Sequence, residues 1–281
     1  MTGIRASAGV APQYAVPQGQ QNPGTITGAE AGRGLPGDCV SSIPTTMPLS
    51  QQDLFAALSR AHSPERLAPY RCPDDDDAAV LARYLWNTLL GEALYPTLQA
   101  LEVALRNSVH AAIAHAYGRA DWYDGTPPIL QARQQDLVAA AKTTLRAAGK
   151  PIAPGRLVAE LPFGFWTSLF NVYYETKGGG DPRLWPRLLR PAFPHIPRRV
   201  RTRRTISRAL NDVRHLRNRV SHHEPIWHNP RLPLQHGEVL ETIRWISPEL
   251  ADVVGLIDRF PAIYAGGPGP CRALLRRATT P

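Results

Sequence analysis

The stretch TLQALEVALRNSVHAAIAHAY, residues 97–117, decides the fold class of this chain. Its apolar residues recur at steps of three and four, which is the spacing of one face of an α-helix. That face consists of Leu98, Leu101, Leu105, Val109, Ala112 and Ile113. A helix with so broad an apolar face is expected to lie at the centre of a helical bundle.

The same stretch carries a polar stripe against its apolar face. Glu102, Arg106 and His110 follow one another at steps of four residues, and Asn107 lies next to Arg106. Glutamate four residues before arginine is the favourable order for an ion pair on a helix. The stripe therefore predicts either a solvated row of ion pairs or the lining of a polar site.

Helical patterns continue on both sides of this stretch. Residues 78–93 have the same helical spacing, and Pro96 is expected to separate or kink the two helices. Capping residues, prolines and glycines predict where further helices begin: near Ser50, after Asp77, near Ile129, at Thr202 or Thr205, and at Ser247. No segment alternates convincingly at a period of two residues, so the sequence predicts an all-α fold.

Composition divides the chain into three parts. Residues 1–45 are rich in Gly, Pro, Gln, Ala and Ser and are expected to be disordered. Residues 46–263 are expected to form the helical domain, and residues 264–281 a basic tail. The N-terminus has no signal peptide pattern, and no apolar run approaches the roughly 18 residues of a membrane span. The three cysteines are scattered and form no CxxC pair: Cys39, Cys72 and Cys271. We therefore expect a cytoplasmic protein in a reducing compartment, without a membrane partner.

Positive charge is concentrated in one segment. The formal net charge of the chain is +9, and the segment 183–219 alone holds twelve arginines and one acid, Asp212. Such a cluster favours an anionic partner, with nucleic acid as the default. The chain uses 29 arginines and 3 lysines overall, which accounts for the choice of arginine but not for the clustering.

Two other clusters allow more than one interpretation. Four consecutive carboxylates, Asp74–Asp77, suit either a metal site or the N-terminus of a helix, and the helix start is the commoner use. A group of aromatic residues suits either the stacking of nucleic acid bases or packing in the core, and their helical spacing favours the core. These aromatic residues are Phe163, Phe165, Trp166, Phe170, Tyr173 and Tyr174.

The segment VRHLRNRVSHHEPIW, residues 213–227, is the main functional candidate. Arg214, Asn218 and His222 form one row on a helix. Arg217 lies about 140° from His222 on an unbroken helix, so the two side chains do not stack. Either the helix loosens near Ser221, or the two residues meet through a second protomer.

These residue types suit chemistry on a phosphodiester. A histidine at a helix end can act as general acid or base at neutral pH, and an arginine offers a planar cationic fork to phosphate. Together they permit metal-free RNA cleavage in which the 2′-hydroxyl attacks the adjacent phosphorus. Two other interpretations stay open: a metal site that uses His222, His223 and His228, and a basic helix that binds RNA without cutting it.

Four motifs in this order resemble the Abi-like (abortive infection) family of bacterial proteins, which is related to AbiD and AbiF and belongs to the HEPN superfamily. The motifs are ARYLWN (82–87), LEVALRN (101–107), LVAELPFGFWTSL (157–169) and LRNRVSHHEPIW (216–227). The resemblance implies an all-helical HEPN-like bundle with additional flanking helices. It also implies a metal-independent endoribonuclease centre shared across a homodimer, with no cofactor.

The resemblance assigns the candidate site residues. Arg217, Asn218 and His222 match the arginine, polar residue and histidine of the superfamily motif, and His223 satisfies its longer spacing. Arg106 and Asn107 belong to a shared motif and are secondary candidates. The neighbouring side chains that we expect to contact RNA, or to line a secondary site, are Arg214, Arg219 and His110.

The resemblance also implies a cellular role. It suggests phage defence by abortive infection, or a toxin, with a small noncoding RNA or an antitoxin as a regulatory partner. The alternative on the same fold is a regulatory protein that binds RNA and does not cleave it.

Overall fold

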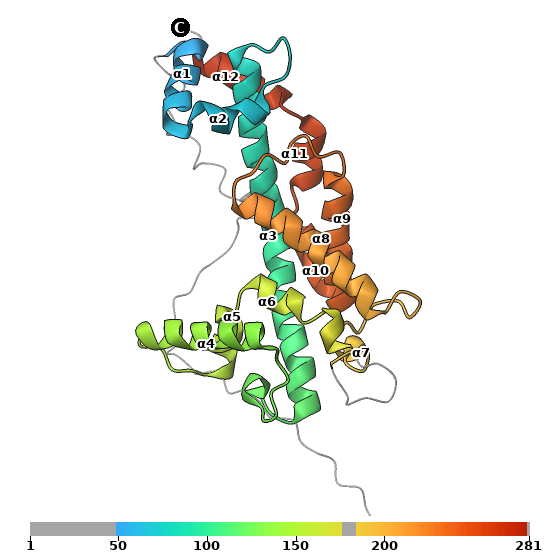
Figure 1. The fold of residues 1–281 in the computed structure, drawn as a ribbon. Helices are drawn as coiled ribbons and strands as arrows, with labels where there is room; N and C mark the ends of the chain where they lie inside the picture. The colour runs from blue at the N-terminus through green and yellow to red at the C-terminus, as the bar shows by residue number, and fades with distance from the viewer. Residues whose placement is uncertain (1–48, 176–183, 280–281) are drawn as a thin grey trace, which may run out of the picture. The chain divides into compact units, whose positions relative to one another are not determined.

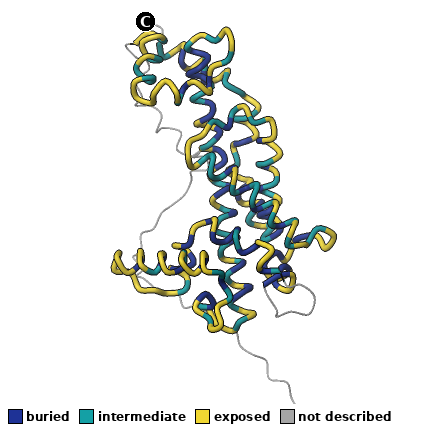
Figure 2. Tube along the Cα trace, in the orientation of Figure 1, coloured by how far each residue is buried: buried dark blue, intermediate teal, exposed yellow. Residues whose placement is uncertain are grey.

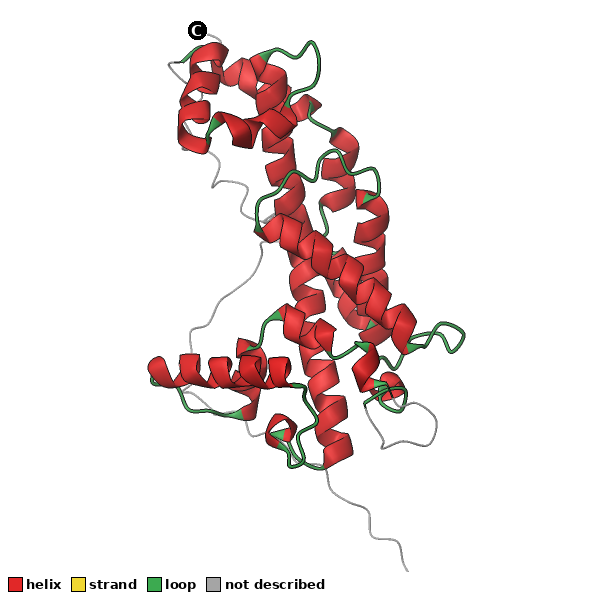
Figure 3. Cartoon of the chain, in the orientation of Figure 1, coloured by secondary structure: helices red, strands yellow, loops and turns green. Residues whose placement is uncertain are grey.

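The computed structural model describes residues 49–175 and 184–279. Figure 3 shows helices joined by loops, and these described residues contain no β-strand. The predicted all-α fold is therefore confirmed for this part of the chain. The predicted disordered segment 1–45, which includes Cys39, lies outside the described residues.

The described elements follow one another in the order shown in Figure 1. The α-helices are α1 (Gln51–His62), α2 (Pro64–Leu67), α3 (Asp77–Tyr117), α4 (Ala132–Ala147), α5 (Pro154–Glu160), α6 (Phe163–Ser168), α7 (Leu189–Ala192), α8 (Arg203–Ser221), α9 (Leu232–Ile246), α10 (Pro248–Gly255), α11 (Phe260–Gly266) and α12 (Gly269–Thr279). Three short 3-10 helices lie between them: η2 (Ala68–Tyr70), η3 (Trp122–Asp124) and η4 (Val172–Tyr174).

Helix α3 runs for 41 residues and includes Pro96. A proline inside a helix removes one hydrogen bond and costs about 3 kcal/mol. Leu90 and Leu94 before the proline and Leu98 after it are buried, and each buried leucine contributes about 1.5–3 kcal/mol. Packing thus outweighs the proline. Of the two expected outcomes, separation into two helices is wrong, and a kink at Pro96 stays a prediction.

Helices from both ends of the chain pack on α3, as expected for a central helix (Figure 1). Near its N-terminus, Trp86 donates from Nε1 to the carbonyl of Ile263 in α11 at 2.9 Å. Nearer its C-terminus, the Ser108 hydroxyl donates to the carbonyl of Ala192 in α7 at 2.6 Å. Figure 2 shows buried positions along the whole length of α3.

The aromatic residues of the α5–α6 region belong mainly to the core. Five of the six are buried: Phe163, Phe165, Trp166, Phe170 and Tyr174. The Phe170 ring stacks on Trp185 with centroids 4.3 Å apart, and Trp185 donates from Nε1 to the Leu169 carbonyl at 2.6 Å. Only Tyr173 of this group is exposed, so packing in the core is confirmed as their main use.

The last two of the four aspartates begin α3, as expected for carboxylates at a helix start. Asp76 is the N-cap residue, and its Oδ1 accepts from the backbone amide of Ala79 at 2.7 Å. Its other carboxylate oxygen lies 2.5 Å from Arg272 of α12. Asp77 pairs with Arg71 at 2.7 Å. The charges of these carboxylates are therefore used for capping and ion pairs.

The C-terminal segment differs from the expected basic tail. Residues 269–279 form α12, which packs against α1 and α3 and buries Cys271 and Leu275. The apolar positions of this helix are few and lie among arginines, so its sequence pattern alone is weak. Contact with the central helix supplies the burial that makes it stable. No helix among the described residues has the length and apolar character needed to cross a membrane.

Candidate functional site

The candidate site is built on α8. Thr202 is its N-cap residue, and the threonine hydroxyl accepts from the amide of Thr205 at 3.1 Å, as the sequence predicts. One face of α8 is buried and faces the bundle: Ile206, Leu210, Val213 and Leu216. Helix α8 crosses α3 obliquely (Figure 1).

The opposite face of α8 forms a basic stripe. Its exposed members are Arg204, Arg208, His215 and His222, with the half-buried Asn211 and Asn218 between them. At 100° per residue these six positions lie within an arc of about 80°. Asp212, the one acid in the basic segment, lies outside that arc. The stripe therefore presents cations and amides along the solvent side of the helix.

Two members of the predicted row lie on this stripe, and the third lies at its edge. Asn218 and His222 belong to it, whereas Arg214 is half-buried beside it and donates from Nη2 to the side-chain oxygen of Asn211 at 3.3 Å. Asn218 and His222 thus share one face of α8, whereas Arg214 forms a hydrogen bond within the helix.

Arg217 points to a different side of α8. Its Nε lies 3.6 Å from a carboxylate oxygen of Glu102 in α3. The amide of His222 still donates to the carbonyl of Asn218 at 2.8 Å, so helical geometry continues up to His222. The proposed loosening near Ser221 therefore does not bring Arg217 and His222 together in one chain. Convergence through a second protomer stays a prediction.

After His222 the chain forms a sharp turn, residues 222–227, which we call the histidine turn. Its second residue, His223, has a left-handed backbone with φ of 54°. This conformation is a common way to end a helix: the amide of His223 donates to the carbonyl of Val220 at 3.1 Å, and the amide of Glu224 donates to the carbonyl of Arg219 at 2.8 Å. The imidazoles of His222 and His223 are both exposed, so this turn is not held by burial of the histidines.

Arg66 from α2 holds the first half of the histidine turn. One of its terminal nitrogens, Nη2, donates to the carbonyl of His222 at 3.1 Å and also to the carbonyl of His223. The side chain of a residue more than 150 positions away thus fixes the backbone beneath both imidazoles.

Asn87 from α3 holds the second half of the turn. Its side-chain oxygen accepts from the amide of Ile226 at 2.7 Å and from the amide of Trp227 at 3.1 Å. Asn87 is 8% exposed, and buried hydrogen bonds of this kind are costly to remove. The Asn87 side chain therefore ties the end of the turn to the central helix.

Arg219 spans the turn from within α8. It donates to the carbonyl of Pro225, and its Nε lies 3.4 Å from the carboxylate of Glu224. These contacts stabilise the histidine turn, and the predicted role of Arg219 in RNA binding or in a secondary site stays a prediction.

The residues of the polar stripe of α3 lie in different environments. Glu102 reaches α8, and Asn107 is exposed. Arg106 is half-buried, and its Nε has no hydrogen-bond partner among the described residues. His110 accepts from Nε1 of the fully buried Trp122 at 3.0 Å. These residues do not form one cluster around the histidine turn.

Burial lowers the pKa of His110 from its ordinary value. Protonation at Nδ1 would break its bond to Trp122 and leave a buried indole N–H without an acceptor. A lowered folded-state pKa means that the unfolded chain binds the proton more readily, so this contribution to stability is present above pH 6.5 and is lost as the pH falls below that value.

We expect the variant His110→Gln to weaken this pH dependence, because glutamine keeps an acceptor and does not titrate. Thermal unfolding measured between pH 7.5 and 5.5 should show a smaller fall in melting temperature for the variant than for the wild type. Equal falls would show that the Trp122–His110 bond does not carry this part of the acid sensitivity.

The three histidines considered for a metal do not gather with other ligands. His222, His223 and His228 are all exposed. In residues 49–175 and 184–279, no group of three or more histidine, cysteine or acidic side chains lies together in a way that could hold an ion.

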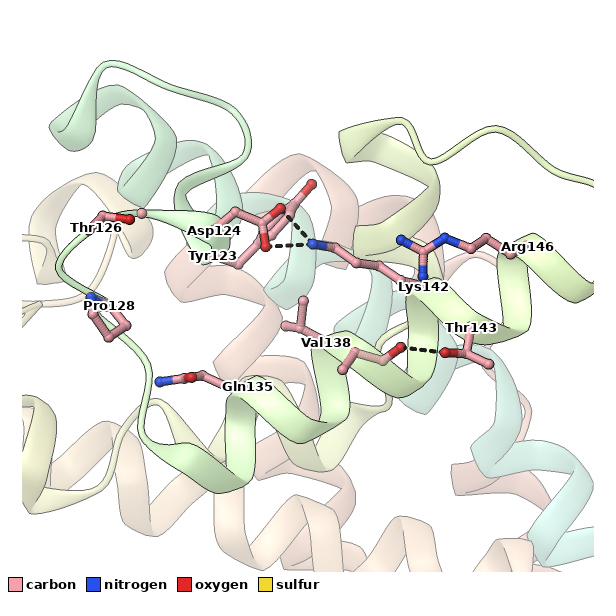
Figure 4. A pocket seen from close by; sticks show the side chains of 11 residues that line it. Tyr123, Asp124, Thr126, Pro128, Gln135, Val138, Lys142, Thr143 and Arg146 are labelled. Carbon is pink, nitrogen blue, oxygen red and sulfur yellow. Dashed lines mark hydrogen bonds and ion pairs between the residues drawn. The ribbon is translucent and has the colours of Figure 1, made fainter.

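A hollow of about 540 Å³ lies between η3 and α4 (Figure 4). Lys142 points across it to the carboxylate of Asp124 at 2.5 Å. Burial raises the pKa of the Tyr123 hydroxyl to about 12. None of the predicted site residues lines this hollow. Its lysine is paired with a carboxylate, and Arg146 also lines it.

Sequence reasoning did not identify Arg66 or Asn87 as part of the site. Asn87 had a detectable signal, because an asparagine inside the helical motif ARYLWN needs a partner when it is buried. Arg66 had no such signal, since its partners are backbone carbonyls distant in the chain.

The fold and the site define an all-helical protein in which a basic helix ends in a firmly held turn with two exposed histidines. No protein-family model, curated protein or solved structure matches this chain.

Proposed function

We propose that this protein is a metal-independent endoribonuclease of the HEPN type, acting as a homodimer. The observation that carries the proposal is the histidine turn: two exposed imidazoles at the end of α8, on a backbone that Arg66, Asn87 and Arg219 hold in place. The turn lies at the end of a basic stripe, which is suited to the phosphates of RNA.

The proposed chemistry uses the RNA as its own nucleophile. One imidazole accepts the proton of the 2′-hydroxyl, whose oxygen then attacks the adjacent phosphorus. The bond from phosphorus to the 5′-oxygen breaks, and a protonated imidazole donates its proton to that oxygen. Arg217 stabilises the charge that develops on the phosphoryl oxygens. The products are a 2′,3′-cyclic phosphate and a 5′-hydroxyl.

The arrangement of the four family-like motifs supports an HEPN-like bundle. ARYLWN contributes Asn87 to the histidine turn, and LEVALRN contributes Glu102 to Arg217. The helices of LVAELPFGFWTSL include α6, which packs against α8. Three motifs that are distant in sequence thus contact the fourth or the helix that carries it. A role in abortive infection or as a toxin in the cytoplasm, with an antitoxin or a small noncoding RNA as regulator, follows from the same resemblance.

The second candidate function is RNA binding without cleavage. It is favoured by the position of Arg217 and His222 on different sides of α8 within one chain. The basic stripe alone suffices for binding.

One assay separates the two functions. Purified protein is incubated with RNA in EDTA beside the double variant Arg217→Ala, His222→Ala, while light scattering gives the mass in solution. We expect a dimer, cleavage with 2′,3′-cyclic phosphate ends, and loss of cleavage in the double variant. Tight binding with intact RNA would favour the regulator, and a strict monomer would remove the shared cleft.

A further inference from the structure

We infer that Glu102 is a positioning residue for Arg217: its carboxylate holds the inner edge of the guanidinium and leaves the outer fork free for a phosphate. This inference rests on the proposed function and goes beyond it, because it assigns a role to a residue on α3 outside the basic helix.

The geometry distinguishes the two edges of the guanidinium. The contact to Glu102 is made through Nε, at 3.6 Å. Among the described residues, the guanidinium of Arg217 makes no hydrogen bond, and its ion pair with Glu102 is recorded through Nε. The Arg217 side chain is 39% exposed, so this free fork is accessible to a ligand. Bidentate recognition of a phosphate uses a guanidinium edge of this kind.

Glu102 contacts Arg217 on α8 and not Arg106, which is nearer to it in the sequence. Arg106 lies four residues further along α3, in the order that favours an ion pair within a helix. The described contacts of Glu102 run instead to Arg217 on a different helix. A half-exposed pair at this distance adds little to folding stability, so stability alone gives no strong reason for the choice.

Positioning has opposite effects on binding and on catalysis. A guanidinium that is already oriented loses less freedom when it engages the transition state. The carboxylate also repels the RNA phosphate, so it weakens binding of the substrate in its ground state. Removal of Glu102 should therefore lower kcat without raising KM.

The decisive experiment measures cleavage by three variants. We expect Glu102→Ala to lower kcat about tenfold or more with KM unchanged or reduced. Glu102→Gln should lose less kcat than Glu102→Ala, because its amide oxygen keeps a polar acceptor facing Nε although it carries no charge. When added to Arg217→Ala, the alanine substitution should cost nothing further. Glu238→Ala is the matched control, since Glu238 lies in an exposed ion pair with Arg231 on α9.

A second readout does not depend on cleavage. The affinity for a 2′-O-methyl RNA, which cannot be cut, is measured by fluorescence anisotropy in the same cycle of variants. Glu102→Ala should strengthen this binding by about twofold in the wild-type background and should leave it unchanged in the Arg217→Ala background.

These outcomes separate the two proposals. If the wild type binds the RNA analogue but cuts no RNA, the enzyme proposal fails. The affinities measured in the same variants still show whether Glu102 positions Arg217. The positioning role would be overturned if Glu102→Ala lowered kcat equally in the wild-type and Arg217→Ala backgrounds. It would also be overturned if Glu102→Ala and Glu102→Gln lowered kcat equally, or if the wild type did not bind the analogue.

Discussion

The variants Arg217→Ala and His222→Ala should each lose RNA cleavage by about 10²- to 10⁴-fold, the usual range for general acid–base and transition-state charge stabilisation. An equimolar mixture of the two, allowed to exchange subunits, should regain about a quarter of the wild-type activity. The reason is geometric. Arg217 and His222 lie on different sides of α8 in one chain, so a shared site takes the arginine from one protomer and the histidine from the other.

In a mixed dimer, one of the two shared sites keeps both residues and the other loses both. If each chain used its own Arg217 and His222, every site in the mixture would lack one residue and no activity would return. His215→Ala is the matched control for the histidine. His215 is exposed on the same basic stripe, about two helical turns before His222. It should affect salt-dependent binding slightly and leave the cleavage step intact.

Replacing Asn87 by leucine should give the largest loss of stability among these variants. Leucine has a similar size but no acceptor, so the amides of Ile226 and Trp227 would lose their partner inside the protein. Buried donors left without a partner cost about 1–3 kcal/mol each. A total loss of about 3 kcal/mol corresponds to a fall of about 6–12 °C in melting temperature for a domain of this size.

The measurement combines thermal unfolding with hydrogen exchange. The amides of Ile226 and Trp227 should exchange faster in Asn87→Leu, and RNA cleavage should fall because the histidine turn is no longer held. Asn107→Leu is the control, since Asn107 is an exposed asparagine on the same helix and should change stability by less than about 0.5 kcal/mol. A melting temperature unchanged in Asn87→Leu would show that the turn does not depend on α3.

Local signals in the sequence predicted the helices well. Ser50 and Ser247 cap helices as predicted, Thr202 caps α8 at one of its two predicted starts, and α3 begins at the last of the four predicted aspartates. A cap acts on amides two or three residues away, so its effect is readable from neighbouring residues. The apolar spacing of residues 97–117 predicted a central helix in the same way, and α3 is central.

The candidate site was only partly predictable. Arg217, Asn218, His222 and His223 are recognisable as a group because they lie within one helix and its end. Which of them point together was partly predictable as well, since the angle between positions on a helix is a local property. Their partners were not, because the contacts of Glu102, Arg66 and Asn87 cross between elements far apart in the chain.

By itself, the sequence determined the all-α class, the central helix, the capped ends of the helices and the basic segment that carries the histidines. These properties follow from periodicity, capping and charge, which act over a few residues. Only the tertiary structure decided that α3 continues through Pro96, that α12 packs on the bundle, and that Arg66 and Asn87 hold the histidine turn. Each of these outcomes depends on burial and hydrogen bonds between distant segments, and such contacts exist only once the helices have packed.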